Sequence, residues 1–284
     1  MKKLGIIAFA LVVQSAFGQA NRFVYQVTMK PDASNKADVK TENAYLDISK
    51  DKSMFYSENR IKRDSIMQKA FQSGAGPGSF NRSQMEGLRS NINYTIEKDK
   101  KDQKITYKDR LGRDNYSYEE DRPMNWKIST ETTKIGDYKV QKAETDFAGR
   151  KWTAWFTTDL PYQDGPYKFT GLPGLIVKVE DATGEYSFDL MKNIKLNSLP
   201  ELNQFGNTIK VKRTAYEKQY EKYITDPVAF MTQSGGGMRM GGGPGGPGGG
   251  RGPGGGQAPA DMRKRMEERV KEEIKLNSNP IELK

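Results

Sequence analysis

Between residues 21 and 199 the chain alternates apolar and polar side chains one by one, in many short stretches. In the first stretch Phe23, Tyr25, Val27 and Met29 share one side. A period of two is typical of strands with one buried face and one solvated face. Because turn residues rather than helices separate most of the stretches, we expect a mostly β fold. The pattern predicts one domain over residues 19–199, built as an antiparallel sheet or a partial barrel.

Two local patterns refine this expected domain. Ile92, Tyr94 and Ile96 face Ile105 and Tyr107 across a polar turn, which predicts a β-hairpin. The stretch from 60 to 85 shows no strand period, and a short helix is predicted around residues 61–71.

The last third of the chain follows other patterns. Residues 200–233 are expected to be helical, with one face formed by Tyr216, Tyr220, Tyr223 and Ile224. Residues 234–259 carry about half of the chain's 29 glycines, interleaved with prolines, and we expect a disordered linker there. Residues 260–284 are expected to form an amphipathic helix and a tail, with an apolar stripe of Met262, Met266, Val270 and Ile274.

The first 18 residues are typical of an export signal. Lys2 and Lys3 precede an apolar run of about ten residues, which is too short to span a bilayer. Small residues at Ala16 and Gly18 fit a signal-peptidase site, so we expect cleavage after Gly18; a retained N-terminal anchor is the alternative. Because no later segment is apolar enough to cross a membrane, the sequence predicts a periplasmic or secreted protein.

Histidine and cysteine are both absent from the 284 residues. Without them the chain cannot build a Ser-His-Asp triad, a Cys-His dyad, a zinc site of the usual type or a disulfide. We therefore expect no metal site and no cofactor. The net charge of +10 is interleaved with 36 acidic residues, which favours a solvated surface over a nucleic-acid site; a polyanion partner is the alternative.

The most distinctive string is Gly-Leu-Pro-Gly-Leu-Ile at residues 171–176. It lacks the spacing of a phosphate-binding loop and precedes an expected strand rather than a helix. Gly171, Pro173 and Gly174 therefore favour a structural turn. In a type II turn Pro173 presets φ at the second position, and Gly174 supplies positive φ at the third. A turn that also lines a ligand cleft is the alternative.

Aromatic residues precede this string. On one expected strand Trp152 and Trp155 point to opposite faces, so either both are packing residues or one lines a groove. The candidate binding residues are Trp152, Trp155, Tyr162, Tyr167 and Leu172. Asp159 and Asp164 form a candidate acid-base pair, and turn-rich surroundings favour surface charges over catalysis. We assign no catalytic residue.

Several segments resemble one family. The string at 171–176, the aromatic stretch "GRKWTAWFTTDLPYQDGPYKF" before it, "IGDYKVQKAE" and the ending "NPIELK" are similar to members of the GLPGLI family, a group of exported Bacteroidetes proteins. The resemblance implies a mostly β envelope protein and transfers no activity. We expect a non-enzymatic binding or assembly factor, for an apolar ligand or an outer-membrane protein. The alternative is a periplasmic hydrolase that uses carboxylates.

Overall fold

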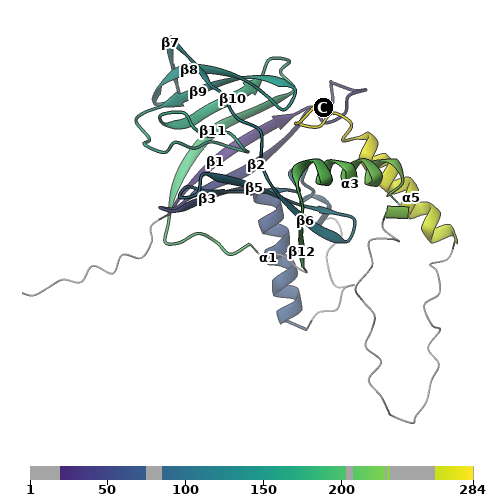
Figure 1. Cartoon of the computed structure of the whole chain (residues 1–284). Coiled ribbons are helices and arrows are strands. Elements are labelled where there is room, and N and C mark those ends of the chain that lie inside the picture. Colours follow the sequence, from purple (N-terminus) through teal and green to yellow (C-terminus); the bar gives the residue numbers. More distant parts are fainter. Residues whose placement is uncertain (1–19, 75–84, 203–206, 228, 231–259, 284) are drawn as a thin grey trace, which may run out of the picture.

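The computed structural model describes residues 20–74, 85–202, 207–227, 229–230 and 260–283. Twelve strands form one sheet in the order β12-β6-β5-β4-β3-β2-β1-β11-β10-β9-β8-β7 (Figure 1). The strands are β1 (Ala20–Met29), β2 (Lys40–Ile48), β3 (Lys52–Ser57), β4 (Thr95–Asp99), β5 (Lys104–Leu111), β6 (Asp114–Glu119), β7 (Lys127–Ile135), β8 (Tyr138–Phe147), β9 (Arg150–Thr157), β10 (Leu175–Asp181), β11 (Tyr186–Leu196) and β12 (Thr208–Lys210).

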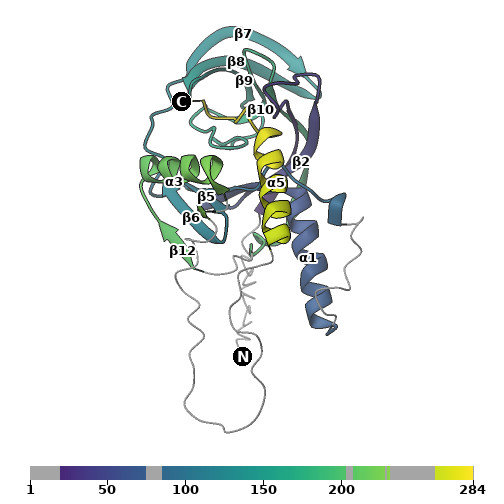
Figure 2. The ribbon, with the colours of Figure 1, turned by 90° about the vertical axis from the view of Figure 1, so that its right-hand side faces the viewer.

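The mostly β prediction is confirmed, with one refinement. The pairings are antiparallel except for β12, which runs parallel to β6, so the sheet is mixed. The sheet is strongly curved, yet β12 and β7 end it as free edges and it does not close into a barrel (Figure 2). The expected signal segment and the Gly/Pro-rich linker lie outside the described residues.

Three helices accompany the sheet in the described part of the chain: α1 (Glu58–Gln72), α3 (Arg213–Thr225) and α5 (Ala260–Lys275). α1 lies where the sequence predicts a short helix. It begins at Glu58, before the expected start at residue 61. α3 packs on β5 and β6 through its tyrosine face, of which Tyr216 is buried. Charged residues fill the other sides of α3, so the helix is amphipathic.

The predicted hairpin is confirmed as β4 and β5. Ile96 pairs with Tyr107, and the next residue pair on the same face joins Lys98 to Ile105. β6 continues the meander, with Tyr118 opposite Tyr107. Because side chains alternate between faces, these pairs all lie on the face that carries the core.

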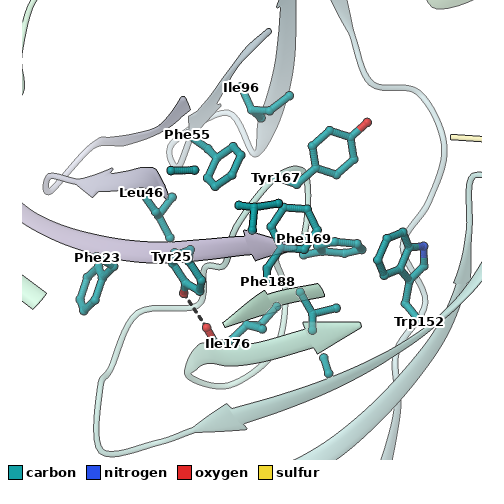
Figure 3. Packing of buried hydrophobic residues seen from close by; sticks show 14 of the residues in the cluster. Phe23, Tyr25, Leu46, Phe55, Ile96, Trp152, Tyr167, Phe169, Ile176 and Phe188 are labelled. Atoms are coloured by element: carbon teal, nitrogen blue, oxygen red, sulfur yellow. Dashed lines mark hydrogen bonds between the residues drawn. The ribbon is translucent and has the colours of Figure 1, made fainter. Parts of the chain in front are cut away.

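The core is rich in aromatic rings (Figure 3). Phe169 packs edge-on against Trp152 with ring centroids 4.8 Å apart, and Phe188 lies beside both. The hydroxyl of Tyr25 donates to the backbone oxygen of Ile176 at 2.5 Å. This bond satisfies the one polar atom of a fully buried ring.

After α5 the C-terminal residues lie against two parts of the chain that are distant in sequence. The amide of Asn279 donates to the Pro31 oxygen at 2.7 Å, and the amide of Leu283 donates to the Ala148 oxygen at 2.8 Å. Both views show the C-terminus beside the end of the sheet formed by β8 to β10 (Figures 1 and 2). We call residues 277–283 the C-terminal strap.

Candidate functional site

A cleft of about 1520 Å³ opens between the sheet, α1, α3 and the C-terminal strap. It is larger than the 300–1,000 Å³ or so typical of small-molecule pockets. Nine of the chain's 14 tyrosines line it: Tyr94, Tyr107, Tyr116, Tyr118, Tyr167, Tyr186, Tyr216, Tyr220 and Tyr223. Apolar residues complete the wall, among them Val27, Met29, Ile92, Leu111 and Phe188.

Five of these tyrosines pack ring against ring in one series. Tyr107 on β5 lies between Tyr94 and Tyr118, at centroid distances of 5.4 and 4.9 Å. Tyr216 on α3 covers Tyr118 at 5.2 Å and continues to Tyr220 at 6.4 Å. Cross-strand pairing of β5 with β6 places the first rings together, and α3 adds the others. The result is a wall of flat rings with hydroxyl edges.

Asp109 supplies an acidic group beside these rings. Its carboxylate accepts hydrogen bonds from the Tyr216 hydroxyl at 2.7 Å and from the Tyr107 hydroxyl at 3.3 Å. Burial raises the pKa of Asp109 above its ordinary value, against the opposing effect of the Tyr216 hydrogen bond. Asp109 is thus a hydrogen-bond acceptor at the cleft wall.

Lys168 links the C-terminal strap to residues at the end of β6. Its ammonium donates to the Tyr118 hydroxyl at 2.8 Å, to Glu120 at 2.6 Å and to Glu282 of the strap at 2.5 Å. Arg122 also pairs with both carboxylates. Burial alone would raise the pKa of Glu120, but hydrogen bonds from Arg122 and Lys168 outweigh it and lower that pKa to about 2.

The residue before Lys168 has an unusual backbone. Tyr167 has a φ of 52°, in the left-handed region that a bulky side chain rarely adopts. Its ring is buried, and its hydroxyl donates to Glu282 at 2.5 Å. The surrounding contacts therefore determine this conformation, which turns both Tyr167 and Lys168 inward.

Arg150 fastens the strap from the other side. Its side chain is 2% exposed and reaches Asp181 at 2.9 Å and Glu185 at 2.8 Å. It also donates to the Asn279 side chain at 2.7 Å and to the Pro280 oxygen at 2.9 Å. Two buried cations, Arg150 and Lys168, thus depend on the strap for part of their hydrogen bonding.

Of the residues proposed from sequence, only Tyr167 lines the cleft. Trp152 and Leu172 belong to the buried core, at 2% and 1% exposure. Trp155 points to the opposite face of β9 and is half-buried. Tyr162 packs against Phe23 and accepts a hydrogen bond from Asn21 at 2.8 Å. The structure thus disperses this set over core, sheet surface and cleft.

The predicted type II turn at Pro173-Gly174 is wrong. Positive φ occurs at Gly171, at 92°, whereas Gly174 has no positive φ. The amide of Gly174 instead donates to the Leu172 oxygen at 2.8 Å, which closes a tighter turn across Pro173. Gly174 is needed for space, because a Cβ there would lie 2.0 Å from the Thr157 oxygen.

The two aspartates of the hydrolase hypothesis lie in different surroundings. Asp159 is exposed. Asp164 is 3% exposed and accepts from the Lys98 ammonium at 2.7 Å. Lys98 also donates to the backbone oxygens of Gly165 and Phe169, so this pair holds the loop before β10 in place.

Sequence reasoning missed most of the cleft residues. From the sequence, Tyr107 is predicted only as a hairpin residue and Tyr216 only as part of a helix face. One signal was available: these faces carry tyrosine where phenylalanine or leucine would fill a dry core equally well. Hydroxyl-bearing rings at several such positions are typical of a surface that meets solvent or a ligand.

Metal and membrane features are limited. Among the residues that the structure describes, no group of three or more Asp and Glu side chains could hold a metal ion. Within those same residues, no helix has the length and apolar character required to cross a bilayer.

Comparisons with known proteins add a partial family match and a fold. Residues 144–178 match the model of a family described as a protein of unknown function (Porph_ging). That match covers β9 and the loop around Lys168; it supplies no activity and does not test the GLPGLI name. No curated protein matches the chain.

A solved structure has a similar fold over part of its length. The structure of PNGF-II in space group P21 aligns with a TM-score of 0.50 and 17% identity, over 72% of this chain and 34% of that one. A structure of PNGF-II in space group C2 gives a TM-score of 0.46 and 16% identity, over 70% and 32%. The chain therefore spans about a third of the length of PNGF-II, and at this identity the likeness concerns the fold alone.

Proposed function

We propose that the protein is an exported, non-enzymatic binding protein of the cell envelope, and that its cleft takes a ligand with a large apolar body. The observation that carries this proposal is the cleft of about 1520 Å³ with nine tyrosines in its wall. The tyrosine rings of the wall present apolar carbon atoms to whatever enters. Their hydroxyls and Asp109 supply the few polar groups that orient a bound molecule.

An outer-membrane protein is the other partner that we consider for an assembly factor. The concave, ring-lined cleft favours the apolar ligand, because protein partners usually bind to broader and flatter surfaces. The export part of the proposal rests on the first 18 residues. Intact mass measurement on protein from its own host should find a chain that begins at Gln19.

Dye binding tests the cleft directly. The neutral dye phenylnaphthylamine fluoresces strongly in apolar surroundings, and we expect wild-type protein to bind it. Tyr216→Ala removes the ring that covers Tyr118 and should weaken dye binding about tenfold. Tyr162→Ala is the matched variant outside the cleft and should leave the affinity unchanged. Equal weakening in both variants, or no binding by wild type, would contradict the proposal.

The hydrolase alternative through Asp159 and Asp164 gains no support from the geometry. Asp164 is committed to Lys98 and Asp159 is exposed, so the described surroundings offer no shared site for an acid and a base. If wild-type protein hydrolyses a substrate, and if Asp164→Ala abolishes this activity while the variant remains folded, the hydrolase would be the better proposal.

A further inference from the structure

Four arginines are partly buried to nearly the same degree, and one of them differs in its pairing. The side chains of Arg22, Arg122 and Arg213 are 18, 23 and 17% exposed, and each pairs with a carboxylate oxygen at 2.5 to 2.7 Å. Arg60 is 20% exposed, yet its closest carboxylate among the described residues is Asp64 at 4.0 Å. A guanidinium that is largely removed from solvent and has no close counter-ion is a site where an anionic ligand would be favourable.

Arg60 is nevertheless held in a defined position. It lies in the first turns of α1, and its Nη1 donates to Thr95 Oγ1 at 2.8 Å and to the Asn93 oxygen at 3.4 Å. These two acceptors fix the guanidinium against the sheet just before and within β4. Nη2 has no acceptor among the described residues, so part of the donor fork is left for another molecule.

The guanidinium of Arg60 belongs to a residue of the cleft wall. Arg63 on the same helix and Asp109 on β5 also line the cleft. Asp109 is an incomplete partner, because its oxygens accept from Tyr216 and from the Arg110 amide, and no ion pair joins it to Arg60 within 4.0 Å. Burial lowers the pKa of Arg60, whereas paired carboxylates raise those of Arg22 and Arg122 despite burial.

We infer that Arg60 is the anion anchor of the cleft, and that the ligand is an amphiphile with a carboxylate or phosphate head group. The head group accepts hydrogen bonds from the Arg60 fork, and the apolar body lies along the tyrosine wall. Planar guanidinium groups bind carboxylate and phosphate oxygens in pairs, which makes this donor specific for an anionic head. This inference rests on the proposed function, since it requires that the cleft binds a ligand at all.

Competition against the neutral dye separates the two proposals. Bound phenylnaphthylamine is displaced from wild-type protein with dodecanoate, dodecyl phosphate, dodecanol and inorganic phosphate. We expect the two anionic amphiphiles to compete at least tenfold better than dodecanol, and inorganic phosphate alone to compete poorly. The ratio between dodecanoate and dodecanol is the measured quantity, because a general loosening of the cleft affects both molecules and leaves the ratio unchanged.

Variants then assign the anchor. Arg60→Met should bring the dodecanoate-to-dodecanol ratio close to one, and Arg60→Lys should leave an intermediate ratio because it keeps the charge and loses the fork. Arg113→Met removes an exposed positive charge outside the cleft and should keep the wild-type ratio. Thermal melting of each variant shows whether the loss of the Thr95 contact has disturbed α1.

The outcomes are distinct. If wild-type protein binds neither the dye nor dodecanol, the proposed function fails and this inference falls with it. If the dye binds but dodecanol competes as well as dodecanoate, only the anion anchor is overturned. Retention of the ratio in Arg60→Met also overturns it, as does inorganic phosphate that competes as well as dodecyl phosphate.

Discussion

A Cβ on Gly174 would lie 2.0 Å from the carbonyl oxygen of Thr157, because the turn before β10 touches the end of β9 backbone to backbone. No side-chain movement relieves this contact, since the other atom belongs to the main chain. We expect Gly174→Ala to lower the free energy of unfolding by about 3 kcal/mol or more. Urea unfolding measures this, and a loss below about 1 kcal/mol would show that the strands can separate freely.

Gly171 in the same string should respond differently. Its φ of 92° is strained for an L-residue, but a Cβ there meets nothing within 4 Å. Gly171→Ala should therefore lose only about 1 kcal/mol, from backbone strain alone. The comparison of the two alanine variants by urea unfolding separates lack of space from backbone conformation. A larger loss at Gly171 than at Gly174 would contradict this assignment.

Leu172 tests whether the string packs the core or binds a ligand. Its side chain is 1% exposed and belongs to the main core cluster. We expect Leu172→Ala to cost about 3 kcal/mol and to lower Tm. At temperatures where the variant remains folded, dye binding should match wild type. An unchanged Tm with lost binding would place Leu172 in the ligand site instead.

These residues show how much of the fold can be predicted from the sequence. The alternation around Ile96 and Tyr107 predicts a hairpin correctly, because strand period and turn chemistry are local properties. The predicted geometry of the turn at Gly174 is wrong. The space that this turn requires is limited by Thr157 on β9, which is distant in sequence and pairs with β10. The cleft could not be predicted for the same reason. Its wall is formed by β5, α3 and the strap, and no local sequence pattern shows that these elements lie together.

Acid should destabilise the protein through Glu120. Its pKa in the fold is about 2, below the ordinary value of 4.5, so protonation is disfavoured in the folded state. The resulting stabilisation is complete above pH ~4.5 and is lost as the pH falls toward 2. We expect Tm to fall through this window. In Glu120→Gln the part of the decline that this carboxylate causes should disappear; an unchanged pH profile would contradict the assignment.

Replacing Lys168 should lower the free energy of unfolding far more than replacing an exposed lysine. Lys168→Met leaves Glu120 and Glu282 without their shared ammonium, and the Glu120 side chain is only 2% exposed. Removing one partner of a buried ion pair typically costs about 3–5 kcal/mol. Lys104→Met is the matched control, because its pair with Glu119 is exposed and should contribute less than about 1 kcal/mol. Equal Tm values for the two variants would refute the buried network.

The C-terminal strap should stabilise the fold despite its position after α5. Deleting residues 276–284 removes Asn279 and Glu282, and leaves Arg150 and Lys168 with fewer hydrogen-bond acceptors in buried surroundings. We expect a loss of about 3 kcal/mol or more, since buried charges then lack part of their compensation. Leu276→Ala is the control, because that side chain is 45% exposed and should change Tm little. If the deletion variant has the Tm of the wild-type protein, the strap is not needed for stability, and Arg150 must find other acceptors.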